Sequence, residues 1–176
     1  SSLKEADDLF FHFNSLTLYI SLFIVYFFPI ILIKWKFIYK NLKLLIVSFV
    51  SSWIYFLFPV RPSKYSVEKI GISTVGLFHK ILRITLKKNC LVDSVFFLSF
   101  LFSLPVLFHI IKCFYDNLKK RRFDFSFFLE LLILSFLFVM PFSYLHWEKY
   151  LLPLIPFLSI RILMINFPAL SGILEY

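Results

Sequence analysis

LTLYISLFIVYFFPIILI, residues 16–33, decides the fold class of this chain, because 18 consecutive positions contain no charged side chain. A helix needs about 20 predominantly apolar residues to cross the hydrocarbon core of a bilayer. The run is apolar on every side, whereas a strand of a membrane barrel would alternate polar and apolar residues. Pro29 lies inside the run, and a membrane helix tolerates proline when its neighbours satisfy the freed carbonyl. We therefore expect a membrane-spanning helix here.

Four further runs have the same character, and the composition agrees with them. The 176-residue chain is 60% hydrophobic, whereas a typical soluble domain is about 45–50% apolar. The five runs together predict a single transmembrane domain over residues 1–176, folded as an all-α polytopic helical bundle with about five spans. The four further spans are expected at residues 44–60, 95–111, 127–144 and 150–165.

The external segment 61–93 interrupts the series of spans and predicts a different kind of helix. From residue 66 onward, apolar residues recur at helical spacing and basic residues occupy the other face. This pattern is typical of an amphipathic helix that lies in the membrane interface, with its basic face toward anionic lipid headgroups. The apolar series is Val67, Ile70, Val75, Phe78, Ile81 and Leu82, and the basic face contains Lys69, Lys80, Arg83, Lys87 and Lys88.

Positive charge sets the expected orientation of the spans. The loop 34–43 contains several lysines and no acid, and residues 119–122 read Lys-Lys-Arg-Arg. Both loops should be cytoplasmic by the positive-inside rule, which places the N-terminus, the segment 61–93 and residues 146–149 together on the external face. The formal charge of +9 is concentrated in the breaks between spans. We therefore expect membrane lipids, and no nucleic acid, as partners of these charges.

The sequence His146-Trp147-Glu148-Lys149 is a short charged turn between two apolar runs on that external face. One interpretation is an interfacial anchor, since Trp, Tyr and Lys are enriched where helix ends meet the membrane surface. The other is a phosphate-binding site, in which Lys149 or His146 binds the phosphate and Glu148 fixes its orientation. Arg83 and Lys87 of the interfacial helix would then add electrostatic stabilisation.

Two charged residues fall inside the expected spans. Glu130 lies near the cytoplasmic end of its span, where either snorkelling to the interface or a bond to a neighbouring helix accounts for it. Arg161 lies inside the last span, and an intramembrane arginine is a functional-site candidate by default. The sequence contains no phosphate-binding glycine loop, zinc-type spacing or nucleophile elbow, and the isolated Cys90 and Cys113 predict no disulfide.

The segment Glu148-Lys149-Tyr150-Leu151-Leu152-Pro153-Leu154-Ile155-Pro156 resembles the (E/D)-(R/K)-Y-L-L-P-x-x-P segment that opens a late transmembrane helix in many GT-C glycosyltransferases. These are polytopic enzymes of the protein O-mannosyltransferase and aminoarabinose-transferase type. The resemblance implies inverting transfer of a sugar from a polyprenyl-phosphate carrier to an acceptor on the extracytoplasmic face. It also implies that Lys149 lies near the carrier phosphate, which is the leaving group.

The chain departs from that family in two ways. The family usually has more spans than the five expected here, and its catalytic acid lies in the first external loop, after the first span. Asp7 and Asp8 instead precede a span, so we assign neither as catalytic and expect the C-terminal region of a larger transferase. No catalytic residue, cofactor or metal site is identified. A need for a divalent metal stays open, because acids that would hold it would lie upstream.

A different class of function is the alternative: a non-catalytic multi-pass membrane subunit, or a fragment of a transporter. A transporter predicts polar residues near the midplane of several spans, or inverted repeats. The mid-span positions here are almost all Phe, Leu, Ile and Ser, which speaks against a transporter and leaves the subunit. Under either interpretation we expect an integral membrane protein, in a bacterial inner membrane or alternatively in the endoplasmic reticulum membrane.

Overall fold

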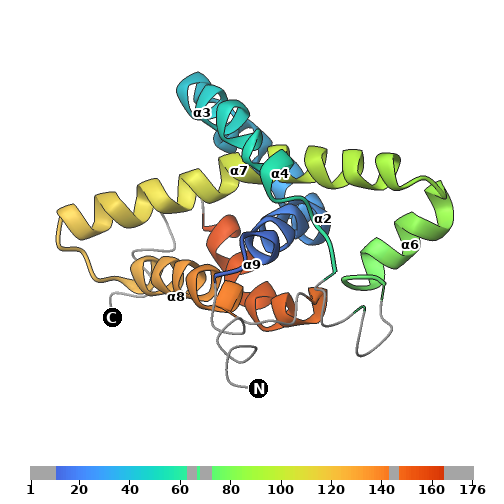
Figure 1. Cartoon of the computed structure of the whole chain (residues 1–176). Helices are drawn as coiled ribbons and strands as arrows, with labels where there is room; N and C mark the ends of the chain where they lie inside the picture. The colour runs from blue at the N-terminus through green and yellow to red at the C-terminus, as the bar shows by residue number, and fades with distance from the viewer. Residues whose placement is uncertain (1–10, 63–66, 68–72, 143–146, 165–176) are drawn as a thin grey trace, which may run out of the picture.

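The computed structural model describes residues 11–62, 67, 73–142 and 147–164, and every regular element in these ranges is a helix (Figure 1). This confirms the all-α class. The α-helices are α2 (Phe13–Ile38), α3 (Leu42–Ser52), α4 (Ile54–Leu57), α6 (Leu77–Leu86), α7 (Asn89–Lys119), α8 (Phe125–Val139) and α9 (Ile155–Leu163), and the 3-10 helices are η2 (Met140–Phe142) and η3 (Glu148–Leu154).

Three helical stretches among the described residues are long and apolar enough to cross a membrane. They are Phe13–Lys36, Asn89–Lys119 and Phe125–Phe142. Each contains all or most of one span expected from the sequence, namely 16–33, 95–111 and 127–144 in that order. Residues 143 and 144 of the last span lie outside the described residues. The chain is therefore compatible with a membrane protein, and the expected count of about five spans is not confirmed.

The other two expected spans form shorter helices. The run 44–60 is divided at Trp53 into α3 and the four-residue α4. The run 150–165 begins within the 3-10 helix η3 and continues as the nine-residue α9. Pro153 lies inside η3 and Pro156 in the first turn of α9. Because proline has no backbone N–H to donate, it interrupts helical hydrogen bonding except in a first turn, which explains why a regular α-helix begins only at residue 155.

The segment 61–93 also differs from the expected single interfacial helix. Residues 63–66 and 68–72 lie outside the described part, and residues 73–76 are not helical. The helix α6 therefore starts at Leu77 and comprises 10 residues. Residues 89–93 belong to the first turns of α7 rather than to the insertion. Within α6, Phe78 and Leu82 of the expected apolar series pack against the core, whereas Ile81 of that series is exposed together with Leu77 and Ile84.

The helix α2 occupies the centre of the fold (Figure 1) and packs against α7, α9, η2 and η3. Its large apolar side chains fill the core; Tyr19, Leu22, Phe23 and Ile31 are all fully buried. Small hydroxyl residues bring α2 and α7 close together, since the backbone N–H of Ile24 donates to Ser103 Oγ at 2.9 Å. Close approach through serine and other small residues is the usual way in which membrane helices pack.

A buried ion pair joins the end of the chain to this core. Arg161 on α9 donates through Nε to Glu130 Oε1 on α8 at 2.8 Å, and its Nη2 bonds the same oxygen. The other carboxylate oxygen accepts from Asn117 Nδ2 on α7 at 3.0 Å. Glu130 is completely buried and Arg161 is 6% exposed. The expected interhelical bond of Glu130 is confirmed, and its partner is the arginine that the sequence marked as a functional candidate.

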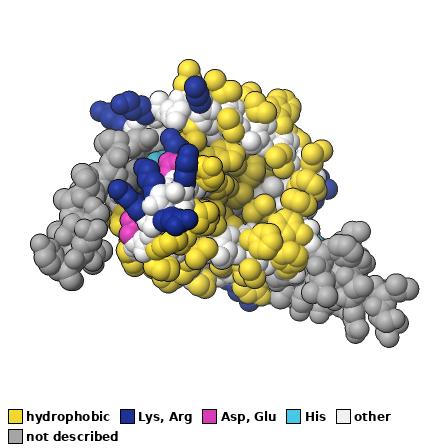
Figure 2. Space-filling model, turned by 90° about the vertical axis from the view of Figure 1, so that its left-hand side faces the viewer, with side chains coloured by type: hydrophobic (Ala, Val, Ile, Leu, Met, Phe, Trp, Pro, Cys, Tyr) yellow, Lys and Arg dark blue, Asp and Glu magenta, His cyan; other side chains and the backbone are white. Residues whose placement is uncertain are grey.

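The outer surface fits contact with lipid. Figure 2 shows hydrophobic side chains over much of one face, with Lys and Arg gathered in one part of it beside acidic side chains and a histidine. Large apolar residues are strongly exposed on several helices, among them Ile33, Leu42 and Leu57 at 71%, 69% and 74%. A soluble monomer rarely exposes so much contiguous apolar surface, whereas lipid tails cover it at no cost.

Replacing Arg161 by Met should destabilise the fold by about 3–5 kcal/mol, because it leaves the buried Glu130 carboxylate without its counter-ion. The double variant with Glu130→Leu should recover most of this loss, since an apolar pair of similar volume needs no compensation. Unfolding free energies in detergent micelles measure both. If the double variant is as unstable as Arg161→Met alone, the loss of stability does not come from the unpaired Glu130 carboxylate.

Candidate functional site

The Glu148 side chain holds three parts of the chain together. The residue is 5% exposed. Its Oε2 accepts the backbone N–H of Phe78 on α6 at 2.9 Å, and its Oε1 accepts the hydroxyl of Tyr26 on α2. Its own backbone N–H donates to the carbonyl of Val75 at 2.8 Å. A buried carboxylate is costly unless donors surround it, and here α2 and α6 supply those donors.

The carboxylate acts as the N-terminal cap of α6. The N-cap residue, Gly76, has no side chain, so the exposed amides of the first turn have no local acceptor. Glu148 takes that place from a distant part of the sequence and bonds the second amide of the helix, as a cap does. Its negative charge also suits the positive end of the helix dipole.

Close packing explains why residue 76 is glycine. A Cβ atom at this position would overlap the Oε2 and Cβ atoms of Glu148 and would lie 2.9 Å from its Cδ. These are atoms of a side chain fixed by hydrogen bonds, so it cannot move aside at low cost. Any larger residue at position 76 would therefore push Glu148 away from α6.

Lys149 lies beside this cap with its charge exposed. Its Nζ stands 4.0 Å from the centre of the Trp147 ring and 5.4 Å from that of Tyr150, within the range of cation–π attraction. Within the part of the chain that the structure describes, the ammonium makes no ion pair with a carboxylate. The aromatic rings thus fix its position and leave its three N–H donors free to bind an anion.

A pocket of about 380 Å³ opens next to Lys149. Its volume lies within the range of about 300–1,000 Å³ that is common for small-molecule sites. It combines one cation with a largely apolar wall, an arrangement suited to an amphiphile with an anionic end. Its lining residues are Tyr26, Thr74, Val75, Gly76, Leu77, Trp147, Glu148, Lys149 and Leu152.

The structure brings together only two of the residues predicted to bind the carrier phosphate. Glu148 and Lys149 line this pocket, while Arg83 lines a separate cavity and donates through Nη1 to the carbonyl of Ser73 at 2.8 Å. Lys87 is exposed at the C-cap of α6, in the left-handed conformation with φ 56°. His146 lies outside the described residues. Both oxygens of Glu148 already accept protein donors, so its contacts are those of a structural cap.

Two residues that shape the site were not predicted from the sequence. Tyr26 lies inside an apolar span, where a hydroxyl is only a weak indication of a polar partner. Gly76 lies in the segment expected to form the interfacial helix, and its missing side chain lets Glu148 approach. Among the described residues, no three His, Cys, Asp or Glu side chains lie close enough together to hold a metal ion.

A buried histidine lies beside the cap, in the first turn of α6. His79 is 8% exposed, and its Nδ1 accepts the backbone N–H of Val75 at 3.2 Å. Its ring packs edge-on against Phe96 of α7. Burial lowers the pKa of His79 below its ordinary value of 6.5, and the nearby Arg83 charge lowers it further, against a smaller opposing effect of Asp93. The ring is therefore neutral at pH 7, with its proton on Nε2.

Replacing Gly76 by Ala should detach Glu148 from α6 and lower the free energy of opening the first turn by about 1–2 kcal/mol, as loss of a cap does. Hydrogen exchange of the Phe78 amide measures this directly. Ser73→Ala, three residues earlier at an exposed side chain, is the matched control and should exchange like the wild type. Equal exchange in both variants would contradict the capping role of Glu148.

Acidification should weaken the packing of α6 through His79. Its pKa is lower in the folded protein than in the unfolded chain, so the unfolded chain binds more protons and stability falls as pH drops through about 6.5. The slope of unfolding free energy between about pH 7.5 and 5.5 should be shallower in His79→Phe than in the wild type. Identical slopes would show that this ring does not contribute.

Comparison with protein-family models, with curated proteins and with solved structures finds no match in any of the three. No family is therefore shown by likeness. The chemistry of the pocket beside Lys149 has to be argued from the contacts described above.

Proposed function

We propose that this chain is part of a membrane glycosyltransferase and that the pocket beside Lys149 receives the phosphate end of a polyprenyl-phosphate sugar. The observation that carries the proposal is the position of Lys149. It is an unpaired cation among the described residues, held on Trp147 at the mouth of an apolar pocket. The resemblance of residues 148–156 to the GT-C segment supports it and supplies the reaction type.

The two ends of such a carrier match the two parts of the pocket. The Lys149 ammonium would bind the phosphate oxygens, and Trp147 would hold the ammonium in place through its ring. Apolar side chains such as Leu77 and Leu152 would cover the first units of the polyprenyl chain. Glu148 would act as a positioning residue, because its bonds to α6 and to Tyr26 keep opposite walls of the pocket in place.

In the proposed reaction, the bond between the sugar anomeric carbon and the phosphate oxygen breaks while an acceptor oxygen bonds to that carbon. The electron pair goes to the carrier phosphate, and the acceptor's proton goes to a base that we do not place among the described residues. Lys149 would stabilise the negative charge that develops on the departing phosphate. Stabilisation of the departing phosphate by a fixed cation is the part of the chemistry that this chain would supply.

The contacts of Glu148 favour one alternative, a non-catalytic membrane subunit. In that case the turn at residues 147–149 serves to cap α6 and to anchor helix ends at the interface, which Trp, Tyr and Lys commonly do. Both oxygens of Glu148 are engaged in the way that this alternative requires. The two functions differ in what they demand of Lys149, since an anchor needs no specific anion.

Binding of a polyprenyl-phosphate sugar to the purified protein in detergent or nanodiscs tests the proposal. Lys149→Gln should weaken binding by about tenfold or more, the effect of losing one charge-assisted contact. Leu152→Trp, which fills the apolar side of the pocket, should weaken it as well. Lys43→Gln removes an exposed cation elsewhere and should bind like the wild type. Equal binding by all four proteins, or none by any, would favour the subunit.

A further inference from the structure

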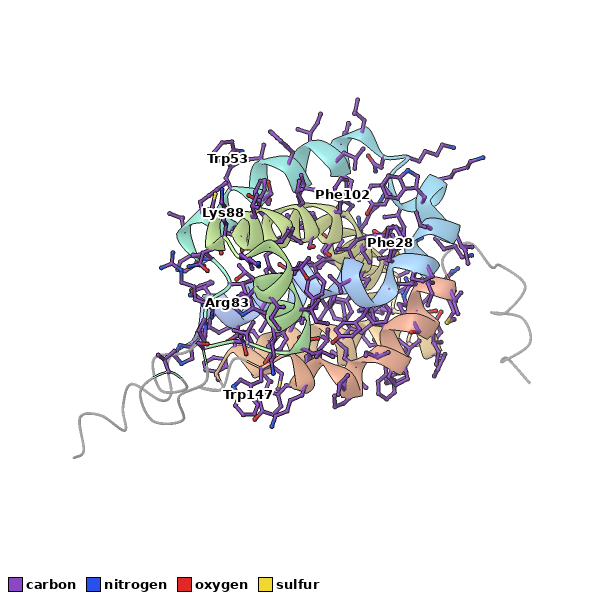
Figure 3. The ribbon with its side chains drawn as sticks, turned by 90° about the vertical axis from the view of Figure 1, so that its right-hand side faces the viewer. Phe28, Trp53, Arg83, Lys88, Phe102 and Trp147 are labelled. Carbon is purple, nitrogen blue, oxygen red and sulfur yellow. The ribbon has the colours of Figure 1, made fainter. Side chains whose placement is uncertain are left out.

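A second cavity lies at the corner between α6 and α7, and its chemistry is distinct from that of the Lys149 pocket. It has a volume of about 330 Å³. Arg83 lies between Trp147 below and Lys88 and Trp53 above (Figure 3), so this corner is set apart from the turn at residue 147. The cavity is lined by Val60, Arg61, Pro62, Ser73, His79, Arg83, Asn89, Val92 and Asp93.

The polar groups of this corner are arranged to bind an anion. Arg83 is held at the rim by its bond to the carbonyl of Ser73, which occupies one guanidinium nitrogen and leaves others free. His79 accepts the Val75 N–H through Nδ1, so its Nε2–H is the donor that the ring can offer to a ligand. Arg61 makes no ion pair with Asp93 or any other acid in the described part of the chain. The two guanidinium groups therefore face the cavity without internal neutralisation.

Asp93 limits the charge that the corner can accept. Two arginines and one aspartate, with His79 neutral, leave a net charge of +1 among the ionisable lining residues. A phosphodiester carries one negative charge and matches this balance. A phosphomonoester or diphosphate carries more and would meet the Asp93 carboxylate. Asp93 and Asn89 can instead bond hydroxyl groups of a headgroup, which need an acceptor or a donor rather than a charge.

An aromatic cavity of about 420 Å³ continues from this corner and shares Arg61 and Asp93 with it. It runs between α4 and α7. Trp53, Phe56 and Leu57, at the end of α3 and in α4, are exposed apolar side chains. A polar cavity beside an apolar one, with two lining residues in common, suits a phospholipid with its headgroup in the first and an acyl chain in the second. The remaining lining residues of the aromatic cavity are Tyr55, Phe56, Pro59, Cys90, Ser94 and Phe97.

From these observations we infer that the α4–α6–α7 corner is a binding site for an anionic glycerophospholipid with hydroxyl groups on its head, such as a phosphatidylglycerol. Arg61, Arg83 and the His79 Nε2–H bind the phosphodiester. Asp93 and Asn89 bond the headgroup hydroxyls, and one acyl chain lies along Phe56 and Phe97. The site does not depend on the proposed function, because it shares no lining residue with the Lys149 pocket.

Cys90 offers a native reporter for this lipid. It lines the aromatic cavity, it is a free thiol, and it is exposed. Cys113 is also free and lies six helical turns further along α7 toward its other end. A lipid bound at the corner should therefore slow alkylation of Cys90 and leave Cys113 unchanged, so each protein contains its own control.

The experiment compares alkylation by N-ethylmaleimide in nanodiscs of phosphatidylcholine alone and of phosphatidylcholine with phosphatidylglycerol, followed peptide by peptide by mass spectrometry. We expect phosphatidylglycerol to slow Cys90 about tenfold in the wild type. Arg61→Gln and Arg83→Gln should lose most of this protection. Arg61→Gln is the more decisive variant, because no described hydrogen bond of the fold depends on that side chain. Lys120→Gln, an exposed cation at the far end of α7, should retain the protection.

Three outcomes would overturn the inference. Equal slowing of Cys90 and Cys113 would show a general effect of membrane charge, and equal protection in Arg61→Gln and Lys120→Gln would show that the corner arginines do not bind the lipid. Protection by soluble glycerophosphoglycerol as strong as by the lipid would assign the corner to a small phosphodiester and not to a membrane lipid. A loss of binding at the Lys149 pocket would leave the protection of Cys90 at the corner unchanged, so the two sites are tested separately.

Discussion

The buried carboxylate of Glu148 is the constraint on which the packing of α6 against the centre of this fold depends. A carboxylate with 5% exposure needs donors, and it obtains them from the hydroxyl of Tyr26 and the first turn of α6. Satisfying that one group fixes α6 against the central helix, requires glycine at position 76, and sets the wall of the pocket beside Lys149. The same interaction therefore determines both where α6 begins and what shape the candidate site has.

The opposite end of the fold solves the same problem with charges of both signs. Glu130 and Arg161 are each almost fully buried, and they neutralise one another across α8 and α9 while Asn117 of α7 bonds the remaining oxygen. An intramembrane arginine is a functional-site candidate by default. Here its partner is an acid that the sequence places 31 positions away. The pair thus accounts for Arg161 as part of the packing, and no binding role is needed to explain it.

Hydropathy was sufficient to predict the helical class and the three long helices, because a long uncharged run has few other stable structures. It could not predict the ends of the shorter helices. The runs 44–60 and 150–165 are as apolar as the others, yet Trp53 divides the first and Pro153 and Pro156 delay the second. Part of the candidate site could also be predicted, because the charges between two apolar runs indicated residues 148 and 149. The role of Glu148 depends on Tyr26, 122 positions away, and no local pattern contains such a contact.

The two sites beside α6 differ in one carboxylate, and that difference decides which anion each can hold. In the pocket at Lys149, both oxygens of Glu148 accept hydrogen bonds from α2 and α6, so its acceptor capacity is used within the fold. Under the proposed function, the Lys149 ammonium would bind the ligand phosphate. At the α4–α6–α7 corner, Asp93 has no such partner among the described residues and faces the same space as Arg61 and Arg83. Under the two proposals, the corner would favour a single negative charge with hydroxyl groups, and the Lys149 pocket a phosphate attached to an apolar chain. The arrangement of the carboxylate at each site, more than the number of basic residues, would then decide which anion each one binds.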